Sequence, residues 1–330
     1  MIKLHRYFLM ILVLASTIIN VAEAKRVTFQ NAEDTISGHY LLPDKGKPKA
    51  VILFVHGDGP LNYDADGYYP LIWERLLEQG FAIFSWDKPG IGGSTGNWLT
   101  QSMQQRQQEV QSAVNFLQTN YGYSGTQIGL LGFSQAGWVV PAVANNNANI
   151  GFVIGIGFAI NWLEQSWYLT HVRLLKKRAS SSEIETARAL HTEEISFLDQ
   201  MPSYDLYLKK YGRKADVITE ARYPFVLKNF RADATQDYIG LQQPMLLLLG
   251  DKDLNVNIWN TKSVVEKLID DQQNIQVSII KNATHGMLDA KHFNEQTPDV
   301  LFLLKLTWKQ EKAFSAEFYT VLDKWLSRQK

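Results

Sequence analysis

A serine in a tight turn is the side chain of this sequence best suited to covalent chemistry. Ser134 is the middle residue of Gly-Phe-Ser-Gln-Ala at positions 132–136, directly after the apolar run 128–131. A strand that turns sharply into a helix leaves no room for large side chains two residues on either side of the serine, which accounts for the glycine and the alanine. Such a turn also aims the backbone N–H of Gln135 at the place where an oxyanion would form, at the positive end of the following helix. The pattern predicts Ser134 as a nucleophile and the Gln135 amide as an oxyanion donor.

A serine hydroxyl is a weak nucleophile near neutral pH. It needs a base within hydrogen-bond reach and a carboxylate that orients this base. Two histidines, His285 and His292, follow the apolar run 245–249. His285 comes just after the further apolar run 275–280 and precedes a glycine, whereas His292 lies in a predicted loop or helix. His285 is therefore expected at the carboxyl edge of a sheet, and His292 on the surface.

The elements that must position these residues form an alternating series. The run 50–55 is apolar throughout, which is typical of a strand buried on both faces of a parallel sheet. Further predicted strands, mostly apolar, span 81–86, 128–131, 152–156, 245–249 and 275–280. Segments with helical spacing of apolar residues separate them, among them 69–79, 101–120 and 258–269. This order predicts an α/β fold with a mostly parallel central sheet and helices on both faces. In such folds the ligand site lies at the carboxyl ends of the strands.

The alternation is interrupted between residues 161 and 241, which contain no strong buried strand and two helical patterns, 161–178 and 182–200. We interpret this stretch as an inserted helical cap, and the apolar stripe of 182–200 as a packing surface. The predicted division is a signal peptide at 1–24, a core at 25–160 that begins with a hairpin, the cap at 161–241 and the rest of the core at 242–330. Three aromatic residues that follow a strand end are predicted to line an apolar substrate pocket: Trp162, Trp167 and Tyr168.

Five motifs in this order, each at a predicted strand end, resemble those of the α/β-hydrolase family. They are His56-Gly57-Asp58-Gly59-Pro60, Asp87-Lys-Pro-Gly-Ile-Gly-Gly-Ser94, the turn around Ser134, Gly250-Asp251-Lys252-Asp253 and Thr284-His285-Gly286. The resemblance covers nearly all of residues 35–330 and implies the α/β-hydrolase fold. The first motif is similar to a pattern of esterase-like and peptidase-like members. The second is interpreted as a structural turn, because the Lys-Ser/Thr ending of a phosphate loop is missing.

The resemblance also implies roles for individual residues. The family order of nucleophile, acid and histidine identifies His285 as the base. The family spacing Gly-x-x-Asp selects Asp253 as the acid, and leaves Asp251 as the alternative, most simply a turn-forming residue. The second oxyanion donor would be the amide of Asp58. The family commonly has a small neutral residue there, since a carboxylate opposes a developing negative charge unless it points away.

Composition limits the partners and cofactors of the chain. Its 330 residues are 45% hydrophobic and contain 33 basic and 33 acidic side chains, so no overall field favours nucleic acid or an anionic membrane. The absence of cysteine excludes disulfides, thiolate metal sites and a cysteine nucleophile. We expect a protein that needs neither a metal nor an organic cofactor. The oligomeric state is left open.

The N-terminal 24 residues have the composition of a cleavable secretory signal. A basic start is followed by the apolar run 7–19 and by Ala22-Glu23-Ala24, a small-x-small site. The run is shorter than the ~18 residues of a membrane span. We therefore expect export to the periplasm or the medium, a mature chain from Lys25 and no membrane span in the mature form; an uncleaved anchor is the alternative.

Together these features favour a serine hydrolase that cleaves an acyl bond, with a carboxylic ester as the first choice of substrate. A short peptide is the alternative within the enzymes, because exported, cap-bearing relatives include peptidases. A non-catalytic binding protein on the same scaffold is the alternative of another class. The intact set of Ser134, Asp253 and His285 argues against it.

Overall fold

The computed structural model describes residues 24–212, 217–269, 274–296 and 299–329. Its centre is an eight-stranded sheet with the order β1-β2-β4-β3-β5-β6-β7-β8. The strands are β1 Lys25–Asn31, β2 Asp34–Leu41, β3 Ala50–Val55, β4 Phe81–Trp86, β5 Ile128–Phe133, β6 Phe152–Ile156, β7 Met245–Gly250 and β8 Ile275–Ile280. Only the N-terminal hairpin pairs antiparallel, β1 with β2 and β2 with β4. The prediction of a mostly parallel sheet is confirmed.

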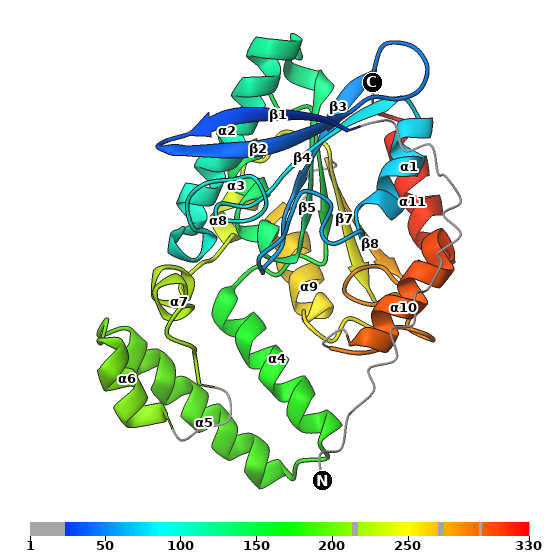
Figure 1. The fold of residues 1–330 in the computed structure, drawn as a ribbon. Coiled ribbons are helices and arrows are strands. Elements are labelled where there is room, and N and C mark those ends of the chain that lie inside the picture. The colour runs from blue at the N-terminus through cyan, green and yellow to red at the C-terminus, as the bar shows by residue number, and fades with distance from the viewer. Residues whose placement is uncertain (1–23, 213–216, 270–273, 297–298, 330) are drawn as a thin grey trace, which may run out of the picture.

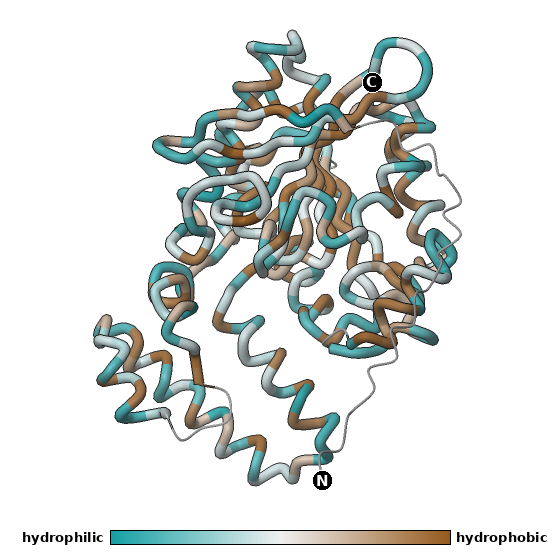
Figure 2. Tube along the Cα trace, in the orientation of Figure 1, coloured by the Kyte–Doolittle hydropathy of each residue, from teal (hydrophilic) through white to brown (hydrophobic). Residues whose placement is uncertain are grey.

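Helices cover both faces of the sheet, so the strands from β4 to β7 in the sheet order are buried on both sides. One face packs against α2 Met103–Tyr121, α3 Val140–Asn146 and α9 Ile258–Ile269; the other packs against α1 Pro70–Glu78 and α11 Ala316–Leu326. Successive residues of a strand point to opposite faces of the sheet. In β3, Leu53 packs in the core under the first group of helices and Ile52 in the core under the second group. Figure 1 shows both layers, and Figure 2 shows the apolar central strands between them.

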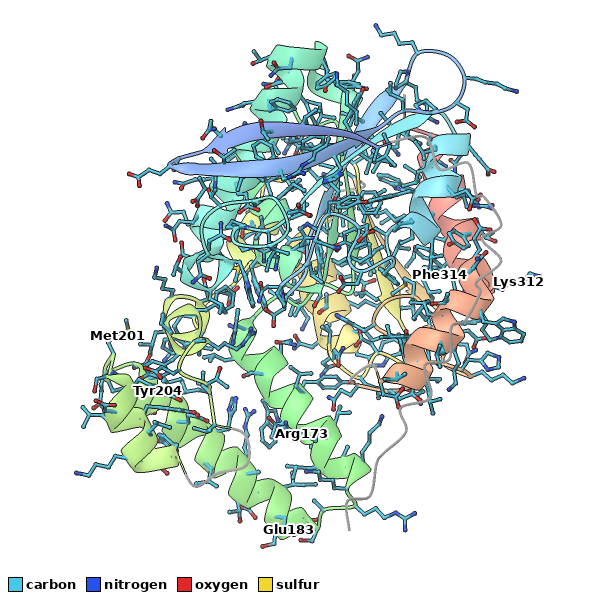
Figure 3. All side chains as sticks on the ribbon, in the orientation of Figure 1. Arg173, Glu183, Met201, Tyr204, Lys312 and Phe314 are labelled. Atoms are coloured by element: carbon cyan, nitrogen blue, oxygen red, sulfur yellow. The ribbon has the colours of Figure 1, made fainter. Side chains whose placement is uncertain are left out.

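Among the described residues, five helices stand between β6 and β7, in the region predicted as a cap. They are α4 Trp162–Lys176, α5 Ser181–Leu198, α6 Tyr204–Tyr211, α7 Tyr223–Asn229 and α8 Thr235–Tyr238. α4, α5 and α6 extend away from the sheet (Figure 1), and Arg173, Glu183 and Tyr204 mark them in Figure 3. They have a small aromatic core of their own around Tyr207, Tyr211 and Tyr223.

The predicted packing stripe of α5 is only partly covered. Leu198 is buried, but Leu190 is 38% exposed and Ile184 is half-buried. The stripe is therefore covered at its C-terminal end, where Leu198 joins the aromatic core of the insertion, and is open to solvent at Leu190.

The helix after Ser134 also begins later than predicted. Residues Ser134–Trp138 form a short 3₁₀ segment, η3, and α3 starts only at Val140. Pro141 explains the break, because proline lacks an N–H and is tolerated only in the first turn of an α-helix. Gln135 thus lies in a 3₁₀ turn rather than at the start of a long α-helix.

The remaining elements are η1 Trp98–Thr100, η2 Gly125–Gln127, α10 Val300–Lys309 and η4 Gln310–Ala313. None of the helices in the described ranges combines the length and the hydropathy needed to cross a bilayer. Of the predicted signal segment, residues 1–24, only Ala24 belongs to the described residues.

Candidate active site

The turn after β5 holds Ser134 in a strained backbone conformation. Its φ of +50° lies in the left-handed region, which a residue other than glycine adopts at a cost of about 1–3 kcal/mol. A Cβ on Gly132 would come within 2.9 Å of the side chains of Ala136, Phe158 and Val140. Glycine is therefore required here, as the sequence argument supposed, and the half-buried Ser134 stands at the carboxyl end of the central strand.

The segment after β3 lies against this turn. A Cβ on Gly57 would meet the Phe133 carbonyl oxygen at 3.2 Å and Ser134 Cβ at 3.4 Å. The backbone N–H of Asp58, one residue on, donates to no acceptor within the described part of the chain. The structure thus brings Asp58 close to Ser134, and the role of its amide as an oxyanion donor stays a prediction.

Asp253 is the carboxylate that contacts His285. Asp253 Oδ2 lies 2.7 Å from His285 Nδ1, and its other oxygen accepts the backbone N–H groups of Asn255 and Val256 at 2.7 and 2.8 Å. Asp251 instead accepts the N–H of Ala283 and pairs with Lys252 in the connection after β7. Of the two candidate acids, the structure brings Asp253 to the histidine.

The hydrogen bond to Asp253 determines the tautomer and the basicity of His285. An ionised carboxylate only accepts, so Nδ1 carries the proton and Nε2 is left as the basic nitrogen. Burial by itself lowers the pKa of His285, but the charge and the hydrogen bond of Asp253 outweigh burial and raise this pKa above its ordinary value. Asp253 therefore stabilises the imidazolium that forms when neutral His285 takes up a proton, as general-base catalysis of acyl transfer requires.

The ring of His285 lies beside Gly157, at the carboxyl end of β6. A Cβ on Gly157, the residue after β6, would lie 2.8 Å from His285 Cε1. β6 is the neighbour of β5, which ends at Phe133 just before Ser134, and neighbouring strands are roughly 4.8 Å apart. No hydrogen bond joins Ser134 and His285 among the described contacts, which is common before a substrate binds. His292, by contrast, lies in the loop after β8 and donates its backbone N–H to the Asp289 carbonyl.

A polar network surrounds the carboxylate of Asp58. Asp58 Oδ2 lies 2.5 Å from Arg222 of the insertion, and Oδ1 accepts from Gln135 Nε2 at 3.2 Å. The buried Arg106 in turn donates to Gln135 Oε1 at 2.7 Å and to the His56 carbonyl at 2.5 Å. Burial raises the pKa of Asp58, yet Arg222 and the other donors outweigh it and leave the pKa below its usual value. The sequence reading missed this network, because its members are far apart along the chain.

Two further buried side chains hold the loop after β3. Lys88 Nζ donates to the carbonyl oxygens of Gly57 at 2.7 Å and Gly59 at 2.9 Å. His56 Nε2 contacts the Trp86 carbonyl at 2.5 Å, and Nδ1 faces the Tyr69 hydroxyl at 3.1 Å. Burial, assisted by the charge of Lys88, lowers the pKa of His56 to about 3. His56 is thus neutral and engaged at both nitrogens, as expected of a structural residue.

A cavity of about 390 Å³ opens beside His285. Tyr68 stands in its wall, donates its hydroxyl to the Gly286 carbonyl and places its ring 5.8 Å from that of Phe133. Much of the remaining wall is apolar and comes from the segment after β8: Leu288, Phe293, Phe302, Leu303 and Leu306. These residues were missed, because only their three-dimensional arrangement places them next to His285.

The three aromatic residues predicted to bind substrate do not line this cavity. Trp162 stacks on Trp138 with ring centroids 5.0 Å apart. Trp167 and Tyr168 line a smaller cavity of about 100 Å³ between α4 and α9, and Tyr168 donates its hydroxyl to the Asp253 carbonyl at 3.0 Å. Their role in substrate binding stays a prediction. In the described ranges, no group of three His, Asp or Glu side chains gathers as a metal site.

Comparisons with known proteins agree with the fold. The family model described as "Serine aminopeptidase, S33" matches residues 46–291, well over half of the chain. A comparison with curated protein sequences found no significant match.

Three solved structures illustrate the similarity in fold. An esterase of Pyrococcus furiosus is 14% identical, with a TM-score of 0.60 over 93% of this chain and 92% of that one. The esterase Est1E of Butyrivibrio proteoclasticus, with ferulic acid bound, is 14% identical, with a TM-score of 0.53 over 86% and 98%. A proline iminopeptidase of Mycobacterium smegmatis is 15% identical, with a TM-score of 0.52 over 80% and 92%. At these identities the similarity establishes the fold alone.

Proposed function

This chain belongs to the serine aminopeptidase S33 family of α/β hydrolases, and we propose that it hydrolyses a carboxylic ester through an acyl-enzyme on Ser134. Family membership makes it a serine hydrolase. The observation that carries the assignment of residues is the hydrogen bond between Asp253 and His285, which follow β7 and β8, while Ser134 follows β5 of the same sheet.

In the proposed reaction, Ser134 Oγ attacks the acyl carbon while His285 Nε2 takes the hydroxyl proton. Asp253 keeps the imidazole in the Nδ1–H tautomer and stabilises the imidazolium. The backbone amides of Gln135 and Asp58 bind the oxyanion. His285 then donates the proton to the leaving alcohol, and water attacks the acyl-enzyme by the same steps in reverse.

The cavity beside His285 supports an ester substrate. The leaving group must lie within reach of His285 Nε2 to receive the proton, so it would enter this cavity. Leu254, Phe293 and Leu306 in the wall suit an apolar or aromatic alcohol. The carboxylate nearest the oxyanion loop, Asp58, is paired with Arg222 and does not serve as a partner for a substrate amine.

One observation favours a short peptide as the second candidate. Asp66 and Glu295 line the same cavity, and their carboxylates would bind the α-ammonium group of a peptide. The description of the matching family as aminopeptidases agrees with this candidate.

Two experiments test the proposal. A fluorophosphonate probe should label the folded enzyme at Ser134, located by peptide mass mapping, and should not label a Ser134→Ala variant. Absence of labelling in the folded wild type would favour the binding protein over the enzyme. Rates on p-nitrophenyl esters against aminoacyl anilides then decide between the two substrates; faster cleavage of the anilides would make the chain a peptidase.

A further inference from the structure

Helix α10 presents an apolar ridge to solvent. Val300, Leu301, Leu304 and Trp308 are 72, 63, 59 and 82% exposed. At 100° per residue these four positions share one side of the helix, while Leu306 on the opposite side is buried. Figure 2 shows α10 as one of the most apolar segments at the periphery of the molecule. Single exposed apolar residues are ordinary, but a contiguous ridge marks an interaction surface.

The charged side chains of α10 itself are basic, and the η4 turn that follows carries one charge of each sign, Glu311 and Lys312. Lys305 and Lys309, one turn apart, flank the ridge, and the ten residues of α10 contain no acidic side chain. Lys312 follows in η4 near the end of the helix (Figure 3). Asp299 is the N-cap of the helix, and its carboxylate accepts the N–H of Phe302 at 2.8 Å. The carboxylate of Asp299 is thus engaged at the N-terminus of α10.

We propose that the α10 ridge, Val300, Leu301, Leu304 and Trp308, binds a lipid bilayer that carries anionic headgroups. An apolar stripe with tryptophan at one end and lysines at its flank is the pattern of helices that lie in the membrane interface. The lysines distinguish this partner from a second copy of the chain. A two-fold axis through α10 would bring the lysines of one protomer close to those of the other, whereas anionic headgroups neutralise them.

The inner side of the same helix connects the lipid surface with the cavity beside His285. Phe302, Leu303 and Leu306 line this cavity, and the four ridge residues do not. Docking through the ridge would therefore place the cavity wall next to the bilayer. If the proposed hydrolysis is correct, apolar esters dissolved in the lipid are the substrates closest to it; the docking itself does not depend on that function.

The absence of cysteine allows a local test. Leu304→Cys, labelled with an environment-sensitive fluorophore, should brighten and shift to the blue on phosphatidylcholine vesicles that contain phosphatidylglycerol. The same label at Leu206→Cys is the control, because Leu206 is 54% exposed on α6, away from α10. A protein held to the vesicle by some other segment would leave the label on Leu304 in water, which overturns the proposal.

Two sets of unlabelled variants measure affinity by vesicle co-sedimentation. Leu301→Gln/Leu304→Gln/Trp308→Gln should abolish binding. Lys305→Gln/Lys309→Gln should weaken it about thirtyfold on anionic vesicles, at about 1 kcal/mol for each lysine, and little on neutral ones. Lys45→Gln/Lys47→Gln, two exposed lysines in the turn after β2, is the charge-matched control.

Hydrolysis of a water-soluble ester and light scattering are measured in parallel. The ridge variants should keep the rate on the soluble ester, which reports folding and separates this proposal from the proposed function. Wild-type protein that binds no vesicles would overturn the proposal and leave the ridge without a lipid partner. A dimer that the triple substitution converts to a monomer, without any lipid binding, would show that the partner is a second copy of the chain.

Discussion

Arg222 of the inserted helical segment holds the carboxylate of Asp58, two residues after His56, at 2.5 Å. The pair explains how an aspartate is tolerated beside a proposed oxyanion site. Asp58 is negatively charged there, but the positive charge of Arg222 offsets this charge, and Gln135 Nε2 donates to the second oxygen of Asp58. Through this pair the insertion, far away in the sequence, contacts the loop that is proposed to bind the oxyanion.

Removal of Arg222 should therefore slow the chemical step. Arg222→Gln leaves the Asp58 carboxylate uncompensated, and we expect kcat to fall about tenfold, less than the ~10²-fold loss typical of a missing oxyanion donor. Stopped-flow measurement of acylation reports the change, and KM should move little.

The second substitution Asp58→Asn should restore most of the rate in the Arg222→Gln background, because it removes the unpaired charge. Arg231→Gln, which breaks the more exposed pair with Asp199, is the control and should leave the rate intact. No recovery in the double variant would mean that Arg222 acts only through packing of the insertion.

Ser134→Ala should fold normally and lose activity by ~10⁴-fold or more, because the nucleophile of an acyl-enzyme mechanism cannot be replaced. Turnover of p-nitrophenyl acetate and the thermal midpoint of the same preparation measure the two properties. A folded variant with near-normal turnover would remove Ser134 from the mechanism.

The two aspartates after β7 should differ sharply. Asp253→Asn removes the acceptor that orients His285 and should lower kcat roughly 10³–10⁴-fold. Asp251→Asn affects only the hydrogen bond to Ala283 and the pair with Lys252, so it should keep most of the rate. The reverse order of losses in folded variants would move the acid to Asp251.

The pH dependence of kcat/KM should follow His285. The base works when neutral, so the rate rises with pH as His285 loses its proton; since Asp253 raises the pKa of His285, the midpoint of this limb should lie above the ordinary histidine value of about 6.5. In Asp253→Asn the raising influence is gone and burial still lowers the pKa. The residual activity should then show its midpoint at lower pH, and an unchanged midpoint would mean that another group is titrating.

We also propose that the chain is exported and that its mature form begins at or near Lys25. The basis is the sequence of residues 1–24, with its basic start, apolar run and Ala22-Glu23-Ala24 site. Intact-mass measurement of the protein from its native host should find this N-terminus in the exported fraction. A cytosolic species that retains Met1 would contradict the proposal.

Local patterns in the sequence were sufficient wherever sterics and periodicity act over a few residues. Apolar runs predicted the strands, since a strand buried on both faces needs an apolar side chain at every position. The small residues around Ser134 predicted the tight turn, because only they leave room for it. The spacing after β7 favoured Asp253 over Asp251, and the structure places Asp253 against His285.

Only the tertiary structure decided which distant faces meet. Asp58 and Arg222 are separated by most of the insertion and a large part of the core, and neither residue type nor spacing predicts their contact. The cavity beside His285 depends in the same way on where α10 packs. Side-chain periodicity shows that a helix has two faces, but the free energy of covering each face depends on the elements brought to it by the rest of the fold. For this reason the half-covered stripe of α5 and the exposed ridge of α10 could not be told from ordinary packing surfaces in the sequence.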